Sequence, residues 1–437
     1  MELPQITGLG HEHRLMTEEE IRRTVLRGLQ EIYAAGRRIL VIIPDHTRSA
    51  PLGPIFRLIY EALADKAAAL DYLMALGTHP PMTEEAIYRR VEITADEHQA
   101  RFPKVRFFNH LWRDPDALAE LGKLTREEVS EITGGLFEMD VTITINKLAL
   151  DYDVLLIVGP VFPHEVVGFS GGNKYLFPGI AGREIINFFH WLGAVITNPV
   201  IIGHKWTPVR MVVDRAASLV KAQKFCLSLV VKDDALAGLP AGGLAGIYFG
   251  APERSWSQAA DLSGKLHIVY KDHPYHTVLS CAPEMYDDIW TAGKCMYKLE
   301  PVVADGGTLI IYAPHVKEVS VTHGRVIEEV GYHTRDYFRN QWDKFQHHPW
   351  GVLAHCTHVK GIGTYEEGVE KPRVNVVLAT GIPPEMCRKI NLGYLDPRSL
   401  RPKDYADRED EGILYVPKAG ETLYRLKHAP KELGGEG

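Results

Sequence analysis

The stretch HEVVGFSGGNKYLFPGIAGREIINFFH, residues 164–190, connects a strand to a helix through a long loop. It holds too many glycines and prolines to form one helix. Before it, the apolar run VLLIVG of residues 154–159 predicts a short buried strand, and residues 183–192 predict a helix. Open α/β sheets bind their ligands in loops at the carboxyl ends of strands. The stretch therefore predicts an α/β fold with a functional loop at a strand end.

The loop itself carries groups suited to an anion. Gly171 and Gly172 let backbone amides approach a ligand closely, and Lys174 adds a positive charge. A Walker A loop is excluded, because Tyr175 follows the lysine where Ser or Thr is required. A zincin helix is excluded because Gly168 stands where the second histidine is required. A purely structural glycine loop with an exposed lysine remains an alternative.

Two further strand ends carry polar side chains. Residues 39–43 predict a buried strand that leads into Asp45-His46-Thr47-Arg48, and residues 52–63 then show helical spacing. Residues 70–76 predict another strand, which ends in Gly77-Thr78-His79. Parallel strands would bring these loops and residues 164–174 to one edge of the sheet. Cations and histidines gathered there favour a small carboxylate or phosphate ligand.

These motifs resemble those of the nickel-dependent lactate racemase family. The family's D-x-T-R loop matches residues 45–48, and its G-T-H loop matches residues 77–79. Its H-E-x-x-G-F-S-G-G-x-K signature matches residues 164–174, and a further histidine follows at His190. The resemblance covers most of the chain, closely to about Val231 and more loosely beyond it.

The resemblance implies a cofactor and roles for single residues. The cofactor is a nickel-pincer nucleotide, a pyridinium mononucleotide that binds nickel through sulfur and carbon. It is tethered to Lys174 as a thioamide, and its nickel is ligated by His190. His79 and His164 are the implied acid/base pair, and Arg48 holds the substrate. Enzymes of cofactor synthesis are implied partners in maturation. The expected cofactor-binding residues are Asp45, Thr47, Ser170, Gly171, Gly172, Lys174 and His190.

The chemistry explains why such a site needs two histidines. Removal of an α-proton beside a carboxylate is very unfavourable, whereas removal of a hydride leaves a stable 2-oxo acid. The ketone can then take the hydride back on its other face. Each enantiomer needs a base near its own hydroxyl, and imidazole titrates near neutral pH. The expected function is therefore a racemase or epimerase of a 2-hydroxy acid, with His79 and His164 as catalytic residues.

The expected substrate site departs from the family. The family's Y-Q-x-x-K helix appears here as Trp290, Thr291 and Lys294. Lysine can still pair with a carboxylate, but the tyrosine hydroxyl is lost and the glutamine is shortened. We expect a substrate larger than lactate, with either an apolar tail lying on Trp290 or a polyol chain. Lys294 as an ordinary helix-surface residue remains an alternative.

Composition excludes several classes of protein. The chain has 437 residues and a formal net charge of -7, which argues against a nucleic-acid partner. No apolar stretch approaches the ~20 residues that span a bilayer. Thr17 and Glu20 predict a helix-capping box near the polar N-terminus rather than a signal peptide. Five scattered cysteines favour reduced thiols and a cytoplasmic location: Cys226, Cys281, Cys295, Cys356 and Cys387.

Alternating strands and helices predict two α/β domains, each with a mostly parallel sheet flanked by helices. We expect an N-terminal cofactor-binding domain at residues 1–255 and a C-terminal domain at residues 265–403. A hinge is expected at about residues 251–264, and the active site in the cleft between the domains. By resemblance to the family, residues 404–437 are expected to pack back on the first domain.

Two other functions remain open. One is a zinc hydrolase with His79, His164 and His190 as ligands, which leaves Lys174 without a role. The other is a homologue that binds the cofactor without catalysis. Other histidines are expected on the surface rather than at a metal: His110, His204, His347, His348, His355 and His358.

Overall fold

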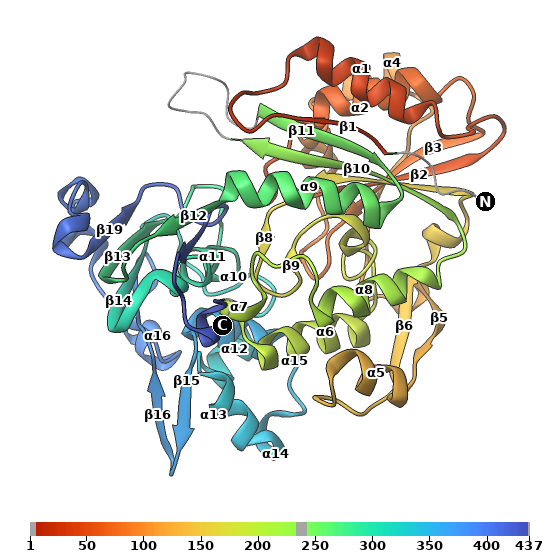
Figure 1. Cartoon of the computed structure of the whole chain (residues 1–437). Coiled ribbons are helices and arrows are strands. Elements are labelled where there is room, and N and C mark those ends of the chain that lie inside the picture. Colours follow the sequence, from red (N-terminus) through yellow and green to blue (C-terminus); the bar gives the residue numbers. More distant parts are fainter. Residues whose placement is uncertain (1–5, 233–242, 436–437) are drawn as a thin grey trace. The chain divides into compact units, whose positions relative to one another are not determined.

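The computed structural model describes residues 6–232 and 243–435 and divides the chain into two compact units. The first unit contains Met1–Phe162, Ser170–Ile186 and Arg210–Leu266. The second contains Pro163–Phe169, Asn187–Val209 and His267–Gly437. Both units are built on sheets whose strands alternate with helices (Figure 1). The expected α/β fold is confirmed.

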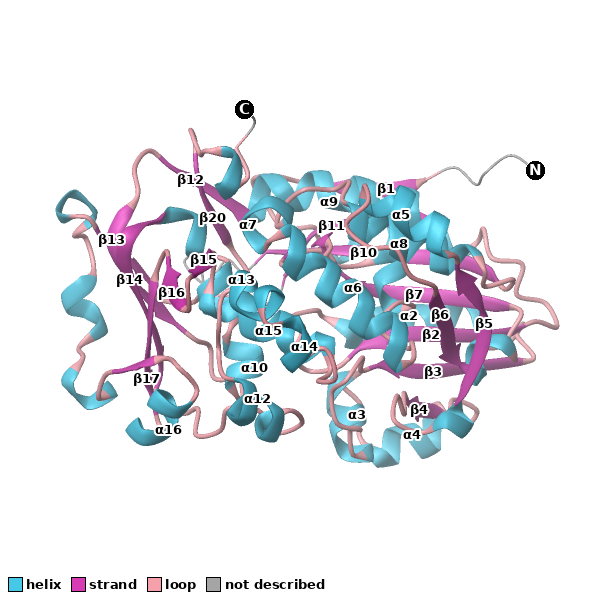
Figure 2. Cartoon of the chain, turned by 90° about the horizontal axis from the view of Figure 1, so that it is seen from below, coloured by secondary structure: helices cyan, strands magenta, loops and turns pink. Residues whose placement is uncertain are grey.

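The sheet of the first unit has the order β1-β11-β10-β7-β2-β3-β4. Neighbours from β10 to β4 run parallel, and only β11 pairs antiparallel with its two neighbours among these strands. Figure 2 shows β10, β7, β2 and β3 side by side. The strands are β1 Thr7–Gly10, β2 Arg38–Pro44, β3 Ala69–Ala75, β4 Phe107–Asn109, β7 Val154–Pro160, β10 Gln223–Lys232 and β11 Gly243–Gly250, with a separate hairpin of β5 Leu118–Leu124 and β6 Val141–Asn146.

Helices of the first unit begin at the capping residues that the sequence provides. Thr17 and Glu20 form the expected capping box, and Thr83 accepts a hydrogen bond from the Ala86 amide at the start of α3. The helices are α1 Glu18–Leu29, α2 Leu52–Leu63, α3 Glu84–Arg90, α4 Ala95–Arg101, α5 Arg126–Thr133, α6 Arg183–Ile196, α8 Pro208–Ser218 and α9 Pro252–His267, with short 3-10 turns η1 Pro115–Ala117, η2 Lys147–Leu150 and η3 Gly172–Tyr175. The last residue of α9, the first two of α8 and most of α6 lie in the second unit.

The second unit has a sheet of order β18-β17-β14-β13-β19 whose neighbours are all parallel. Its strands are β13 Tyr275–Cys281, β14 Val303–Ala313, β17 Asn375–Thr380, β18 Gly393–Tyr394 and β19 Ile413–Val416, with three smaller pairs, β8 Pro163–His164 with β9 Gly168–Phe169, β12 Ile268–Lys271 with β20 Leu423–Leu426, and β15 Gly363–Glu366 with β16 Val369–Pro372. Its helices are α7 Asn198–Ile201, α10 Ile289–Ala292, α11 Lys294–Tyr297, α12 Gly324–Val330, α13 Arg335–Asn340, α14 Trp342–Phe345, α15 Trp350–Lys360 and α16 Pro384–Lys389, with 3-10 turns η5 Glu300–Val302, η6 Pro397–Ser399, η7 Pro402–Tyr405, η8 Glu409–Glu411 and η9 Lys431–Leu433.

The two compact units divide the chain differently from the expected domains. Residues 404–435 lie in the second unit, where β19 pairs with β13 and β20 pairs with β12, and their packing on the first domain stays a prediction. Residues 436–437 lie outside the described part. Most of the expected hinge lies in the continuous helix α9, residues 252–267, whose Trp256 is buried, and the hinge stays a prediction. The chain also leaves the first unit at residues 163–169 and 187–209.

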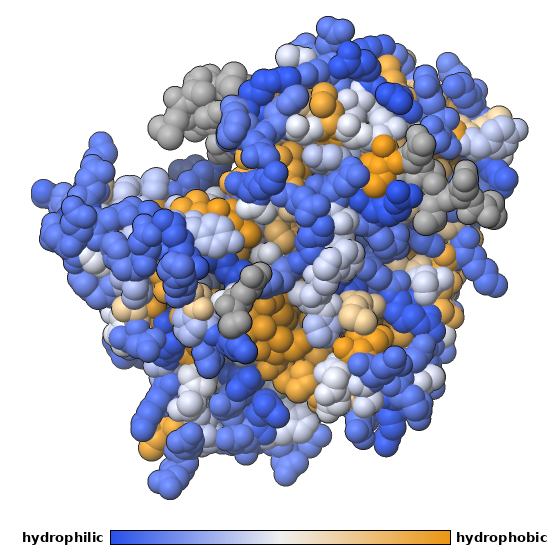
Figure 3. Space-filling model, in the orientation of Figure 1, coloured by the Kyte–Doolittle hydropathy of each residue, from blue (hydrophilic) through white to orange (hydrophobic). Residues whose placement is uncertain are grey.

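The surface is mostly hydrophilic on the face drawn in Figure 3, with scattered hydrophobic patches. The core of the first unit is a continuous apolar cluster on the strands and helices around β2, β3 and β7. All five cysteines are free and buried, as expected for reduced thiols. In the part of the chain that the structure describes, no helix has both the length and the apolar character to cross a membrane.

Candidate active site

Three loops of the first unit meet at the carboxyl edge of its sheet. They follow β2, β3 and β7, which are adjacent and parallel. The Gly77 amide donates a hydrogen bond of 2.9 Å to the Gly179 carbonyl, which ties the second loop to the third. The expected convergence is therefore confirmed for the loops of Asp45, His79 and Lys174.

Asp45 holds the imidazole of His79. The Asp45 Oδ2 and His79 Nδ1 atoms are 2.5 Å apart, and the other carboxylate oxygen accepts bonds from the Thr47 amide (3.0 Å) and hydroxyl (2.6 Å). Burial alone would raise the pKa of the Asp45 carboxyl, but His79, Arg48 and Thr47 together lower that pKa below its usual value. The carboxylate therefore fixes Nδ1 of His79 as the donor and leaves Nε2 as the acceptor. We expected a cofactor role for Asp45 and missed this one.

Arg90, at the end of α3, binds the backbone of the Asp45 loop. It donates to the carbonyls of Pro44 (3.1 Å), Ala50 (3.1 Å) and Arg48 (2.9 Å). Burial lowers the pKa of Arg90, and the Asp45 carboxylate opposes that shift. The guanidinium therefore fixes the backbone of the loop that carries Arg48. No local pattern predicts these bonds, because the residues that Arg90 binds lie at least 40 positions away.

Ser170 holds the glycine loop to the end of β7. Its hydroxyl donates to the Pro160 carbonyl at 3.2 Å and accepts from the Phe162 amide at 2.9 Å. The indole nitrogen of Trp256 donates to the Ser170 carbonyl at 2.9 Å. The two bonds of the Ser170 hydroxyl are local to the loop, so this side chain positions the backbone.

Gly171 and Gly172 are required by both conformation and space. Their φ angles are 88° and 59°, in the region that favours glycine. A Cβ on Gly171 would lie 2.7 Å from the Val161 side chain, and one on Gly172 would lie 3.0 Å from Trp256. Arg210 donates to the Gly171 carbonyl at 3.3 Å and lies 4.0 Å over the Trp256 ring. The loop is thus supported from behind by Arg210 and Trp256.

Lys174 lies in η3, half-buried, with a buried residue on each side. The Asn173 side chain donates to Asp214 (3.0 Å) and Glu253 (2.6 Å), while its Oδ1 has no hydrogen-bond partner among the described residues. The Tyr175 hydroxyl packs against Gly159, where a Cβ would collide with it. These two neighbours fix the backbone on both sides of the lysine.

In the second unit, His164 stands on a tight two-strand turn. Its Nδ1 accepts a hydrogen bond from the Val166 amide at 3.1 Å, and the Glu165 carboxylate lies 3.3 Å from the same nitrogen. Because Nδ1 is an acceptor here, a neutral His164 carries its proton on Nε2. Gly168 has a φ of 84°, and a Cβ there would collide with the His204 carbonyl. This close approach explains the glycine of the signature.

His190 lies on α6, which the sequence predicted as a helix from residue 183. Its ring stacks on Phe189 at 4.3 Å between centroids. A Cβ on Gly351 of α15 would lie 3.8 Å from His190 Nδ1, so the imidazole faces a position without a side chain. Among the described residues, no group of three or more His, Cys, Asp or Glu side chains is arranged to hold a metal ion.

Trp290 and Thr291 lie on α10, which Asp288 caps by accepting from the Thr291 amide at 3.0 Å. The rings of His323 and His355 each lie 4.3 Å from the Trp290 ring, tilted by 38° and 31°. The indole is thus packed against two imidazoles. This packing could not be predicted from the sequence, because the three residues are far apart along the chain.

Lys294 begins α11 and is half-buried. Its ammonium lies 4.4 Å over the ring of Tyr286, which is itself buried. Such a cation–π contact fixes the direction of an otherwise flexible side chain. Lys294 is therefore more constrained than an ordinary lysine on a helix surface.

Three histidines expected on the surface are buried. His355 and His358 lie on α15 with 8% and 4% exposure, and His110 is fully buried. His110 contacts the Ala181 carbonyl at 2.9 Å and the Asn146 amide at 3.2 Å. These side chains belong to the interior, and the expectation for them is wrong.

The units contribute different parts of the expected site. The expectation that they meet in a cleft there stays a prediction. The first unit carries Asp45, Thr47, Arg48, His79, Ser170, Gly171, Gly172 and Lys174. The second carries His164, His190, Trp290, Thr291 and Lys294.

Comparison with known proteins finds lactate racemases. Residues 11–200 match the lactate racemase N-terminal domain. This segment of the chain is therefore a lactate racemase N-terminal domain by similarity. It is 30% identical over 192 residues to the lactate racemase of Thermoanaerobacterium thermosaccharolyticum and 29% identical over 175 residues to that of Lactiplantibacillus plantarum. The matches cover 42% and 39% of this chain, and only 40% and 36% of the two relatives.

Solved structures extend the similarity to nearly the whole chain. A Thermotoga maritima protein of known crystal structure is 33% identical, with a TM-score of 0.87 over 96% of this chain and 100% of that one. The lactate racemase apoprotein of Thermoanaerobacterium thermosaccharolyticum has a TM-score of 0.71 at 19% identity, over 94% of this chain and 93% of that one. The second match is evidence for the fold alone.

Proposed function

We propose that this protein is a racemase or epimerase of a 2-hydroxy acid that uses a nickel-pincer nucleotide, tethered to Lys174 and ligated through His190. The observation that carries the proposal is the Asp45–His79 pair, set beside the supported Lys174 loop at one sheet edge in a segment that matches the lactate racemase N-terminal domain. Maturation would require the enzymes of cofactor synthesis.

The Lys174 loop fits such a group. Gly171 and Gly172 present their backbone without side chains, and the buried Asn173 Oδ1 has no partner among the described residues. Backbone amides of this kind suit the phosphate of a nucleotide. When bound, the cofactor supplies a place for the substrate hydride to be stored and returned.

The two catalytic histidines need different proton states for each turnover. With its Nδ1 proton directed at Asp45, a neutral His79 offers Nε2 as a base for the substrate hydroxyl. To act as the acid, His164 must be an imidazolium, a form that the Glu165 carboxylate, 3.3 Å from its Nδ1, would stabilise. Oxidation of one enantiomer would thus deliver a proton to His79, and reduction to the other would take one from His164.

The substrate carboxylate is assigned to cations that the chain holds in place. Arg48 stands on the backbone that Arg90 fixes, and Lys294 is held over Tyr286. A planar guanidinium pairs with a carboxylate through two parallel bonds. Fixed cations orient the α-carbon, because the carboxylate is bonded directly to it.

The substrate tail is expected to be polar. We expected either an apolar tail on Trp290 or a polyol chain. In the structure, the ring centroids of His323 and His355 each lie 4.3 Å from that of the Trp290 indole. Imidazole nitrogens offer hydrogen bonds to hydroxyl groups. The arrangement therefore favours a hydroxylated substrate larger than lactate.

One experiment tests the proposal directly. The protein would be produced together with the cofactor-synthesis enzymes, and its intact mass and the modified peptide measured. We expect an adduct on Lys174 and inversion at the second carbon in a panel of lactate, malate, 2-hydroxybutyrate, phenyllactate and a sugar acid. An unmodified Lys174 in a protein that still inverts a substrate would overturn the cofactor assignment. A loaded protein inactive on the whole panel would overturn the racemase assignment.

A further inference from the structure

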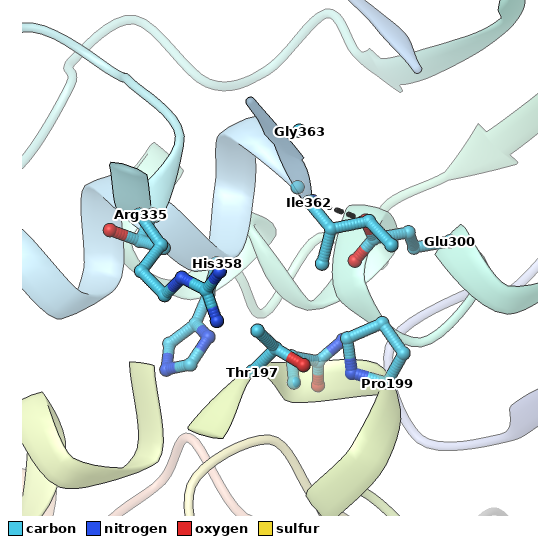
Figure 4. A pocket seen from close by; sticks show the side chains of 10 residues that line it. Thr197, Pro199, Glu300, Arg335, His358, Ile362 and Gly363 are labelled. Carbon is cyan, nitrogen blue, oxygen red and sulfur yellow. Dashed lines mark hydrogen bonds between the residues drawn. The ribbon is translucent and has the colours of Figure 1, made fainter. Parts of the chain in front are cut away.

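A separate pocket lies wholly within the second unit. It is formed where the chain leaves α6, beside η5, α13 and α15, and its empty volume is about 320 Å³ including the solvent at its mouth. Its polar side chains include Asn198, Glu300, Arg335 and His358 (Figure 4). None of these residues takes part in the function proposed above.

Among the residues that the structure describes, three side chains of this pocket have a buried polar atom without a hydrogen-bond partner. These atoms are Glu300 Oε2, Asn198 Oδ1 and His358 Nε2, in side chains with 0%, 3% and 4% exposure. Native proteins rarely leave a buried polar atom unpaired, because its desolvation is then not compensated. Three such atoms around one cavity indicate that the bonds are completed by a bound molecule.

The other bonds of these side chains show what they offer. Glu300 Oε1 accepts from the Ile362 amide at 2.7 Å, which leaves Oε2. Burial raises the pKa of this carboxyl, and Arg373, the Ile362 amide and the Asn198 side chain oppose that shift, as an ammonium beside Oε2 would. The Asn198 amide nitrogen donates to the Tyr297 carbonyl at 2.9 Å, which leaves Oδ1 as the acceptor. Burial lowers the pKa of His358 to about 3, so this imidazole is neutral and can accept through Nε2. All three groups therefore suit a donor.

Arg335 supplies a positive charge and hydrogen-bond donors. Its Nε donates to Asp336 at 2.8 Å, and one terminal nitrogen donates to the Val195 carbonyl at 3.1 Å. Figure 4 shows the guanidinium directed into the pocket from the side opposite Glu300. The pocket thus offers a cation at one side and acceptors at the other.

Thr197 at the pocket has a strained backbone. Its φ is 94°, a value that a β-branched residue adopts only when the surrounding structure holds it there. Such strain is found most often at ligand sites. Here it places Asn198 at the pocket, directly after α6.

We propose that this pocket binds a small α-amino acid as its zwitterion. The ammonium has three N–H donors, which match the acceptors of Glu300, Asn198 and His358. The carboxylate, one carbon away, pairs with the Arg335 guanidinium. A ligand with only one of the two charges would leave one side of the pocket unsatisfied. A metal ion fits less well, since it would share the pocket with a guanidinium.

The test is a calorimetric titration of the full chain with each of the common α-amino acids. Neither nickel nor turnover is needed, so a failure here is distinct from a failure of the racemase proposal. We expect one-to-one binding of one or a few amino acids. For the best of them, the deaminated carboxylate and the decarboxylated amine should bind at least about tenfold more weakly, as expected for a lost charge-assisted bond.

Two variants test whether the amino acid binds in this pocket. Glu300→Gln and Arg335→Gln should each raise the dissociation constant about tenfold to a hundredfold. Glu409→Gln is the matched control, because Glu409 lies in the same unit and pairs with Lys271 away from the pocket lining. Its affinity should equal that of the unchanged protein. Arg335 is partly exposed, so its variant decides the question if Glu300→Gln does not fold.

Three outcomes would overturn the proposal. The first is that no amino acid binds. The second is that binding survives unchanged in both variants. The third is that a divalent cation alone, tested as Mn²⁺ or Zn²⁺, binds in place of amino acids and is lost in Glu300→Gln, which would assign the pocket to a metal.

Discussion

His79 and His164 are held in opposite ways. In the first unit, the Asp45 carboxylate receives the Nδ1 proton of His79. In the second unit, the Nδ1 of His164 receives a backbone proton from Val166. A carboxylate can follow a change of charge on its imidazole, whereas a backbone amide can only donate. When neutral, the same residue type is thus held as the Nδ1–H tautomer in one unit and as the Nε2–H tautomer in the other.

In the proposed mechanism, the direction of each turnover depends on which imidazole carries the extra proton. With His79 neutral and His164 protonated, the protein accepts the enantiomer whose hydroxyl meets His79. After one turnover, His79 holds a proton and His164 has lost one, so the protein is ready for the other enantiomer. Both directions therefore depend on both histidines, although the two are held differently.

The largest effect is expected from the loss of Lys174, because without the cofactor neither histidine can act. Lys174→Ala should abolish both the covalent adduct and the activity, because the tether runs through this amine. Intact mass and a racemisation assay measure the two losses. Lys147→Ala, a change at an exposed lysine of the same unit, should leave both intact. Full turnover by Lys174→Ala would show that the loop only positions the chain.

The next effect tests whether the histidines act as a pair. His79→Ala and His164→Ala should each lower the rate about a hundredfold or more, the usual scale for loss of a general acid or base. Initial rates from each pure enantiomer measure both directions. The exposed His13→Ala is a control for the substitution itself. Near-normal rates in one direction for either variant would contradict the paired roles.

A smaller effect concerns the carboxylate site of the first unit. Arg48→Lys should raise KM roughly tenfold, because a point charge does not replace a planar fork. Steady-state kinetics with the best substrate of the panel measures it. Arg22→Lys is the matched control, since Arg22 pairs with Glu61 on the surface. An unchanged KM would mean that Arg48 does not bind the carboxylate.

The sequence predicted the strands and the loops of the first unit because the relevant patterns are local. Residues 39–43, 70–76 and 154–159 are apolar runs, and polar motifs follow directly after them. Adjacent parallel strands then bring these motifs together without further information. The Asp45 loop and the Lys174 loop were found in this way.

The contacts that hold the site in place could not be predicted from the sequence. Arg90 and Arg210 reach carbonyls about 40 positions away in the sequence, and no local pattern marks such a bond. Helix α15 is buried on nearly all sides, so its histidines show no polar face. The pairing of β19 with β13 also joins segments more than 100 residues apart, which the spacing of apolar residues does not reveal.

The smallest expected effect tests how much the carboxylate beside each histidine contributes to stability. Asp45→Asn keeps the shape but removes the charge that orients His79. We expect a loss of about 2 kcal/mol in the free energy of unfolding at neutral pH, the scale of a hydrogen bond to a charged group. Glu165→Gln is the control beside His164 and should cost less, because Nδ1 of His164 is already bonded to a backbone amide.

The pH dependence of that loss has a defined sign. The pKa of Asp45 is lowered in the folded protein, so its contribution is fully present above the unfolded value of 3.8 and is lost as pH falls below it. Urea unfolding of the unchanged protein and Asp45→Asn should therefore show a constant difference from pH 7 to about pH 5, and a shrinking one below about pH 4. A difference that grows on acidification would mean that Asp45 is protonated in the folded protein. His79 would then lack the anionic partner on which its role as the base depends.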